Sequence, residues 1–375
     1  MPAPFFLSTP TGRELLRVEG RRYTQGVRVD AFDFDLPPDL IAQEPSLVRG
    51  TSRLLRLDRR SGAVSHHVFS DLVDLLVPGD LLVVNDTRVF PARLIGRRLP
   101  GGGAAECFLI RPTSDEDTWL ALVHPGQRLK PGSRMQFERE GQVLEAEVVG
   151  QHFHGRRTVR LRTPDRTSVR EAIHAIGHVP LPPYVKRDDT AADRERYQTV
   201  YSRVEGSIAA PTAGLHFTPA MFEALAARGI HRASVTLHVG YGTFQPVRAE
   251  RVEEHQMEAE RFEVPEATAA ALTSALRERR RVIAVGTTTT RTLESLAVSD
   301  SGTIEPQSGE TALFITPGHA FRLVSGMVTN FHLPRSSLLM LVSALAGREA
   351  VLHAYQQAIE HRYRFYSYGD AMLVV

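Results

Sequence analysis

A change of sequence pattern between residues 94 and 163 divides this 375-residue chain. The interval consists of short strand-like runs between Gly, Pro and Asp turns, namely CFLIRP, TWLALVHPG, RMQFER, VLEAEVVG and RTVRLRT. Short strands at even spacing are typical of a small antiparallel β-barrel. We therefore expect residues 94–163 to form a β-barrel domain inserted into a larger domain.

Strands and helices alternate on both sides of this interval. Thr218, Pro219 and Gly229 predict the helix PAMFEALAAR, as N-cap, first helical residue and stop signal. The buried strand VIAVG runs directly into the helix TTTTRTLESLA, which predicts parallel βα units. The expected fold class is α/β: a layered domain with a mixed sheet, made of residues 27–93 and 164–375, carrying the inserted barrel.

Residues 1–26 fall outside this pattern, and we expect an N-terminal extension or a misplaced translation start there. They contain no apolar run of secretory-signal length behind a basic start. A stretch of 18 apolar residues is missing from the whole sequence, which argues against a transmembrane helix. The single Cys107 excludes an intrachain disulfide and fits a reducing compartment. A cytoplasmic protein without a membrane partner is expected.

The formal net charge of +2 is too small for a protein that coats nucleic acid through its overall charge. A local contact is still possible, because residues 156–203 hold 11 basic and 6 acidic residues with three tyrosines interleaved. Cations with aromatic rings suit a phosphate backbone and splayed bases, and a solvated basic face is the alternative. The candidate contacts to nucleic acid are Arg88, Arg93, Tyr184, Lys186 and Arg187.

The first candidate ligand site is APTAGLHFT, residues 210–218, directly before a predicted helix. Its small residues let the backbone approach a ligand closely, and a helix N-terminus attracts anionic groups. The alternative is a helix-entry loop with a surface histidine. The candidate residues are Thr212, Gly214, His216 and Phe217.

The second candidate is TLHVGYGTFQPV, residues 236–247, where a strand ends in two closely spaced glycines. Its hydroxyl and aromatic groups suit a purine or a sugar. The string lacks the third glycine and the following helix of a dinucleotide fingerprint, which disfavours a nicotinamide site. The alternative is a glycine-bearing bulge with a core phenylalanine. The candidate residues are His238, Gly240, Gly242, Thr243 and Phe244.

The third candidate is VIAVGTTTTRTLES, in which backbone N–H groups and hydroxyls open a helix directly after a strand. Arg291 has the geometry to clamp a carboxylate, with Thr287 and Thr288 beside it. The string lacks the Walker lysine, which disfavours nucleoside triphosphate hydrolysis. Plain capping of the helix by a threonine is the alternative.

Two histidine motifs complete the candidate chemistry. TNFHLPRSSLLM places Asn330 and His332 on a turn before an apolar helix, as an acid–base or base-reading pair or as a satisfied loop histidine. EEHQMEAERFEV surrounds His255 with glutamates, as a general base or as a solvated charged loop. It lacks the HExxH order, so no metal site is expected.

Eight strings in order resemble the S-adenosylmethionine:tRNA ribosyltransferase-isomerase family of queuosine biosynthesis. The resemblance runs from about Val27 to Val375 and departs from the family pattern in the N-terminal extension and at Glu258, where a histidine is expected. The strings are NDTRVFPARL, VPLPPYVKR, RYQTVYSR, APTAGLHFT, TLHVGYGTFQPV, VIAVGTTTTRTLES, TNFHLPRSSLLMLVSALAG and RYRFYSYGDAMLV.

The resemblance implies that S-adenosylmethionine is consumed as a ribosyl donor. Its ribosyl group would be transferred and isomerised onto 7-aminomethyl-7-deazaguanine at the tRNA wobble position, giving epoxyqueuosine, adenine and methionine. No metal or other cofactor is implied, and a monomer is expected. The same resemblance implies an α/β domain with an inserted β-barrel, and we expect the eight strings to share one cavity at the carboxyl ends of the parallel strands.

The implied chemistry needs a base that removes a proton next to the sulfonium, and histidine suits this step at neutral pH. His216 and His332 rank above His238 and His255, because each lies in a loop that precedes a helix. Arg291 is expected to hold the methionine carboxylate. Phe244 would face the adenine, and Lys186 would steady an anticodon phosphate or the expelled purine.

Two other classes of function remain open on the residues alone. They are an S-adenosylmethionine-dependent RNA methyltransferase and a non-catalytic RNA-binding protein. The products separate the three, since a methyltransferase leaves S-adenosylhomocysteine and a binding protein leaves S-adenosylmethionine intact.

Overall fold

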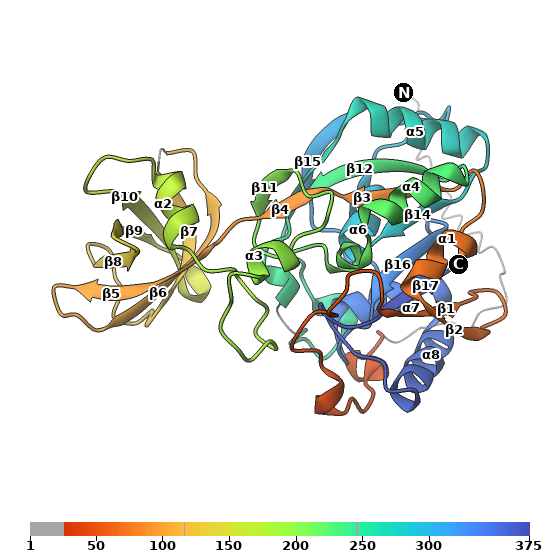
Figure 1. Cartoon of the computed structure of the whole chain (residues 1–375), viewed down its shortest axis with the longest axis horizontal. Helices are drawn as coiled ribbons and strands as arrows, with labels where there is room; N and C mark the ends of the chain where they lie inside the picture. The colour runs from red at the N-terminus through yellow and green to blue at the C-terminus, as the bar shows by residue number, and fades with distance from the viewer. Residues whose placement is uncertain (1–25, 116, 245–246) are drawn as a thin grey trace, which may run out of the picture.

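The computed structural model describes residues 26–115, 117–244 and 247–375. Residues 1–25, nearly all of the predicted N-terminal extension, lie outside the described residues. Figure 1 shows an α/β body and a smaller barrel beside it. The predicted fold class is confirmed, because a large mixed sheet and a closed antiparallel barrel are both present.

Within the described residues, nine strands form one sheet in the order β15-β13-β12-β3-β14-β16-β17-β1-β2. The four strands β12, β3, β14 and β16 are mutually parallel, and β17 pairs antiparallel with β16. The bounds are β1 Arg53–Leu57, β2 Val64–Val68, β3 Leu81–Asn85, β12 His231–Leu237, β13 Glu260–Val264, β14 Val282–Val285, β15 Gln307–Thr311, β16 Gly326–Asn330 and β17 Ala371–Val374.

The central strands are buried on both faces, as expected for apolar runs in a covered parallel sheet. Side chains alternate along β3, so that Leu82 and Val84 pack with α1 and α4, whereas Leu81 and Val83 pack with α5 and α6. Helices α7 and α8 cover the β1–β17 side. The helices are α1 Leu72–Leu75, α2 Val169–Ile176, α3 Asp193–Arg196, α4 Pro219–Ala227, α5 Glu266–Arg277, α6 Thr287–Ser295, α7 Ser337–Ala346 and α8 Arg348–Glu360.

The barrel closes in the order β10-β7-β6-β5-β8-β9, and the pairings between its described strands are antiparallel. Its core also holds the apolar face of α2, which begins at the N-cap Ser168, beyond the sequence-based boundary at residue 163. The bounds are β5 Arg93–Leu99, β6 Ala104–Pro112, β7 Thr118–His124, β8 Arg134–Arg139, β9 Gln142–Gln151 and β10 Arg156–Arg162.

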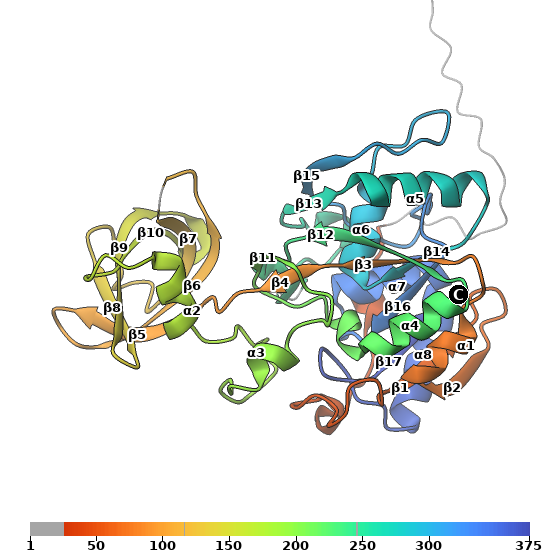
Figure 2. The same ribbon diagram turned by 45° about the horizontal axis from the view of Figure 1, so that its top comes forward.

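A small parallel pair of strands, β4 Thr87–Val89 and β11 Val204–Ser207, lies where the barrel joins the α/β body (Figure 2). Short 3-10 helices link the other elements, at η1 Val29–Phe32, η2 Pro38–Leu40, η3 Phe69–Asp71, η4 Phe153–Gly155, η5 Thr212–His216, η6 Tyr241–Phe244 and η7 Val252–Glu254. Of the helices described, none alone is long and apolar enough to cross a bilayer; α7 and α8 reach that measure only as a pair bent by 114°.

Candidate active site

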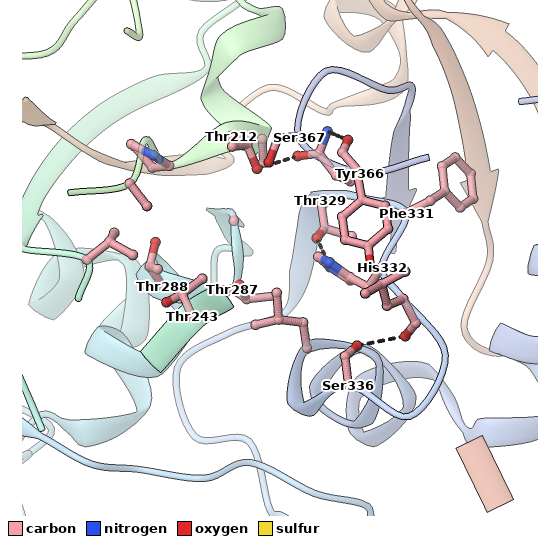
Figure 3. Close-up of a pocket in the computed structure, with 18 of the residues that line it drawn as sticks. Thr212, Thr243, Thr287, Thr288, Thr329, Phe331, His332, Ser336, Tyr366 and Ser367 are labelled. Carbon is pink, nitrogen blue, oxygen red and sulfur yellow. Dashed lines mark hydrogen bonds between the residues drawn. The ribbon is translucent and has the colours of Figure 1, made fainter. Parts of the chain in front are cut away.

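A cavity of about 350 Å³ opens at the carboxyl ends of β14 and β16. Its walls come from the segment around η5, the start of α6, the turn from β16 to α7, and the turn before β17 (Figure 3). Seven of the eight family-like strings contribute residues to it, and only NDTRVFPARL is absent from the described lining. The predicted shared cavity is therefore present, at the edge of the sheet where open α/β folds bind ligands.

Hydroxyl groups gather on the side of the cavity formed by α6 and η6, as Thr243, Thr287 and Thr288 (Figure 3). Gly286 links β14 to α6 with φ +89°, a left-handed conformation that favours glycine. No side-chain hydrogen bond caps this helix, so simple capping by a threonine is not observed. The first N–H groups of α6 thus begin at the cavity wall, where they favour an anionic or strongly polar ligand group.

Asn330 connects the cavity wall to His216. Its Nδ2 lies 3.2 Å from the carbonyl of Tyr366 and 3.5 Å from that of Asp370, and two acceptors beside this atom identify it as the amide nitrogen. The same Nδ2 donates to Nε2 of His216 at 3.0 Å, and Oδ1 accepts from the Thr212 hydroxyl at 3.1 Å. The Nε2 atom is therefore unprotonated, which makes the buried ring the Nδ1–H tautomer.

His216 is enclosed and does not line the cavity, despite its high rank as a base. Its Nδ1 donates to the Ser52 hydroxyl at 2.7 Å, and its ring lies 4.9 Å from the Phe69 ring. Burial lowers the pKa of His216 to about 4. Because both ring nitrogens have partners within the fold, the geometry gives His216 a positioning role toward Asn330.

His332 does line the cavity, next to the Tyr366 ring (Figure 3). Its Nε2 lies 2.8 Å from the Thr329 hydroxyl, and its backbone N–H donates to the Tyr355 hydroxyl at 2.9 Å. Burial lowers its pKa to about 3, so the ring is neutral at physiological pH. Of the four predicted histidines, only His332 is among the described residues that border the cavity.

The remaining two histidines lie elsewhere. His238 shares a 2.9 Å hydrogen bond between its Nδ1 and the Thr87 hydroxyl. His255 packs edge-on against Phe314 at 5.1 Å between ring centroids. Burial lowers the pKa of both rings. Glu258, which replaces the expected histidine, pairs with Arg156 at the start of β10 and so ties the barrel to the α/β domain.

Arg291 does not reach the cavity as the expected carboxylate clamp. It is buried, and its Nη1 lies 2.5 Å from Oε2 of Glu260. Its Nε donates to the Leu313 carbonyl at 2.9 Å. The other Glu260 oxygen accepts from the Gly240 N–H at 2.9 Å and from the Thr243 hydroxyl at 3.4 Å. The ion pair thus anchors the turn that carries Thr243 to the cavity wall.

Several other predicted ligand residues serve packing. Phe217 is a core residue, stacked on Phe222 with 5.0 Å between ring centroids. At Gly214 a Cβ atom would lie 2.0 Å from the Tyr201 hydroxyl, so close packing alone requires glycine. Gly240 and Gly242 lie outside the described lining, and the side chain of Phe244 lies outside the described residues.

The structure adds cavity residues that the motif analysis missed. Arg335 is the one cation among the described lining residues, and it sits in a left-handed conformation before the α7 N-cap. Tyr366 packs against Tyr184 with 4.0 Å between ring centroids and an angle of 34° between the ring planes, and the hydroxyls of Tyr184 and Ser367 hydrogen-bond. Both residues lie inside family-like strings, Arg335 in RSS (335–337) and Tyr366 in FYSY (365–368). Neither segment has a spacing that by itself predicts a ligand site.

Some of the residues predicted to contact nucleic acid are exposed, and others are held by ion pairs within the fold. Arg88 and Lys186 are exposed, and Arg88 donates to the Ser202 hydroxyl at 3.2 Å. Arg93 pairs with Glu106 at 3.0 Å, and Arg187 makes a bidentate pair with the buried Asp193. Tyr184 instead lines the cavity. No group of three or more metal-ligating side chains occurs in the part of the chain that the structure describes.

Comparison with known proteins agrees with this arrangement. A family model described as queuosine biosynthesis protein matches residues 29–374. A relative from Heliobacterium modesticaldum is 52% identical over 93% of this chain and 100% of its own length, and one from Sorangium cellulosum is 48% identical over 93% and 98%. Both bear the name S-adenosylmethionine:tRNA ribosyltransferase-isomerase.

A solved structure supports the same conclusion. The crystal structure of an S-adenosylmethionine tRNA ribosyltransferase from Thermotoga maritima is 37% identical and superposes with a TM-score of 0.52, covering 92% of this chain and 100% of that one. Sequence, fold and the shared cavity therefore agree, and this chain belongs to the queuosine biosynthesis protein family.

Proposed function

We propose that this chain transfers the ribosyl group of S-adenosylmethionine to 7-aminomethyl-7-deazaguanine at the tRNA wobble position and isomerises it, releasing adenine and methionine. The observation that carries the proposal is the cavity in which seven family-like strings meet. Its volume of about 350 Å³ lies in the range of small-molecule sites. The rival functions, methyl transfer and RNA binding without catalysis, are not favoured by the relatives.

The lining of the cavity offers groups that suit the different parts of S-adenosylmethionine. Arg335 takes the methionine carboxylate, the role expected of Arg291, because it is the one cation among the described lining residues. Its Nε lies 3.5 Å from Oδ2 of Asp33 in an exposed ion pair, which the substrate carboxylate would replace. The adjacent rings of Tyr184 and Tyr366 offer an aromatic surface for the adenine. Thr243, Thr287 and Thr288 meet the ribose hydroxyls.

His332 is the proposed base. The bond between C5′ and its hydrogen breaks, the proton passes to Nδ1 of His332, and Nε2–H donates to the Thr329 hydroxyl. The electron pair left on C5′ expels the ring oxygen from C4′, and collapse of the opened sugar to an aldehyde at C1′ releases adenine. The substrate amine adds to C4′ of the resulting vinyl sulfonium, the regenerated carbanion at C5′ bonds to C1′ and closes a five-carbon ring, and the alkoxide formed at C1′ displaces methionine from C5′ to give the epoxide. A neutral ring at physiological pH is the form that accepts a proton, although its low pKa makes the step depend on a strongly acidified C–H.

The test is a product assay with tRNA that carries 7-aminomethyl-7-deazaguanine. We expect one adenine and one methionine per modified tRNA, at a rate that EDTA leaves unchanged, because no metal is part of the proposal. His332→Ala should bind S-adenosylmethionine and release no adenine. Formation of S-adenosylhomocysteine would instead establish the methyltransferase. We also propose that the protein is a monomer, which light scattering would test, and that it is cytoplasmic, which cell fractionation would test.

A further inference from the structure

A second cavity, also of about 350 Å³, lies between the barrel and the α/β domain. Its lining includes aromatic residues, Trp119 on β7 and Phe90 before β5, and polar residues, Arg170 and His174 on α2 and Glu205 on β11. The described linings of this cavity and of the candidate active site have no residue in common.

Its aromatic wall is rigidly held. Trp119 is the single tryptophan of the sequence, and its backbone pairs with Val159 of β10 on one side and Pro112 of β6 on the other. Its ring lies 5.5 Å from the ring of the buried Phe90. An aromatic face fixed in a barrel wall is the kind of platform on which single-stranded nucleic acid stacks a base.

The polar wall selects the edge of a base over a phosphate. Glu205 accepts from Arg170 at 2.8 Å and lies 2.9 Å from Nε2 of His174, so the guanidinium and the imidazole already have a partner in the fold. Asp115 and Asp117 add two more carboxylates to the lining. Carboxylates repel a phosphate and accept hydrogen bonds from the N–H groups of a nucleobase.

One short segment of chain, β11 and the residues directly after it, borders both cavities. Glu205 and Gly206 of β11 border the second cavity, and Ala209 and Ala210 border the candidate active site. The three residue steps from Gly206 to Ala209 span at most about 11 Å. A nucleotide near the reacting one in a splayed RNA strand therefore reaches the second cavity.

We propose that the second cavity binds a nucleobase of the substrate RNA that flanks the modified guanine, stacked on Trp119. The inference rests on the proposed function, because it takes tRNA as the substrate. It assigns to the barrel junction a part in choosing the RNA sequence next to the reacting nucleotide.

The single tryptophan allows a direct test with the full chain. Anticodon stem–loop RNA is titrated while Trp119 fluorescence and, separately, the anisotropy of labelled RNA are followed. We expect quenching that saturates with binding, and loss of this quenching when one flanking nucleotide is abasic, while an abasic site in the stem has no effect. Binding without quenching, or quenching that no abasic loop site removes, overturns the proposal.

Kinetic measurements on variants provide a second test of the proposed base site. Trp119→Ala should raise KM for the RNA about 5- to 150-fold, which is the range for the loss of one stacked base, with KM for S-adenosylmethionine unchanged. Trp119→Phe should restore most of the affinity. Phe153→Ala is the matched control, because this barrel phenylalanine is 89% exposed and lies outside the cavity. Equal losses in Trp119→Ala and Phe153→Ala contradict a base site. Adenine release by the unaltered protein tests the proposed function separately.

Discussion

Asn330 and His216 fix each other in single orientations, with Nδ2 of Asn330 donating to Nε2 of His216 at 3.0 Å. The contact joins the end of β16 to η5, two segments that the sequence separates by more than 100 residues. Asn330 borders the cavity, whereas His216 stands behind it with Ser52 as its other partner. In the proposed reaction, we therefore expect His216 to act through the amide of Asn330, which it helps to orient.

The first prediction concerns this pair. His216→Ala removes an acceptor from a buried amide, so kcat should fall by about 5- to 150-fold, equivalent to about 1–3 kcal/mol. His216→Gln should recover part of the rate, since its amide oxygen can accept from Asn330. Rates measured from pH 6 to 9 should keep the same profile in both variants. A profile that loses an ionisation in His216→Ala would identify His216 as a base after all.

The second prediction concerns acid stability. The pKa values of His216 and His332, about 4 and about 3, lie below the 6.5 of a free histidine, so the unfolded chain binds these protons more readily. Stability is therefore full above pH 6.5 and falls as the pH drops toward 4. At pH 5, each of the two histidines should lower the free energy of unfolding by about 2 kcal/mol relative to its value at neutral pH. Urea unfolding at pH 7.5 and 5 checks this, and His332→Gln should show a smaller decline.

The third prediction separates two adjacent cations. Lys186 is exposed, whereas Arg187 pairs with Asp193, which is also held by Thr190 and Tyr368. Lys186→Ala should raise KM for tRNA and lower the salt slope of binding by about one, with unfolding unchanged. Arg187→Ala should instead cost about 3–5 kcal/mol of stability. The reverse pattern in the two assays would contradict the assignment.

Much of the architecture was predictable because local patterns specify it. The alternation in β5 to β10 marks a barrel wall, and the run VIAVG marks a covered strand regardless of its neighbours in space. The shared cavity was predictable too, since strands that end at one edge of a sheet bring their following loops together.

Side-chain roles within the motifs were harder to predict. Arg291 and Arg335 both follow the pattern of a cation near a helix start, but only the fold shows that Glu260 lies within reach of Arg291. His216 and Phe217 belong to the same motif as Thr212. In the fold, however, His216 contacts Ser52 and Phe217 contacts Phe222. The contacts of these side chains are made with residues that are distant in sequence, and the local spacing of a motif does not predict such contacts.

The fourth prediction concerns the buried pair of Arg291 and Glu260. Arg291→Met leaves a carboxylate buried without its cation, which should cost about 3–5 kcal/mol, and adding Glu260→Gln should recover most of it. The matched control is Arg261→Met, on the same strand as Glu260. Arg261 forms an exposed ion pair with Glu310, and its loss should cost less than about 1 kcal/mol of stability.

In the double variant, KM for S-adenosylmethionine should rise moderately, because Gly240 and Thr243 keep only a neutral acceptor. If Arg291→Met instead weakens S-adenosylmethionine binding at full stability, Arg291 is the carboxylate clamp and Arg335 is not. Denaturant unfolding and isothermal titration of the same four proteins decide between these outcomes.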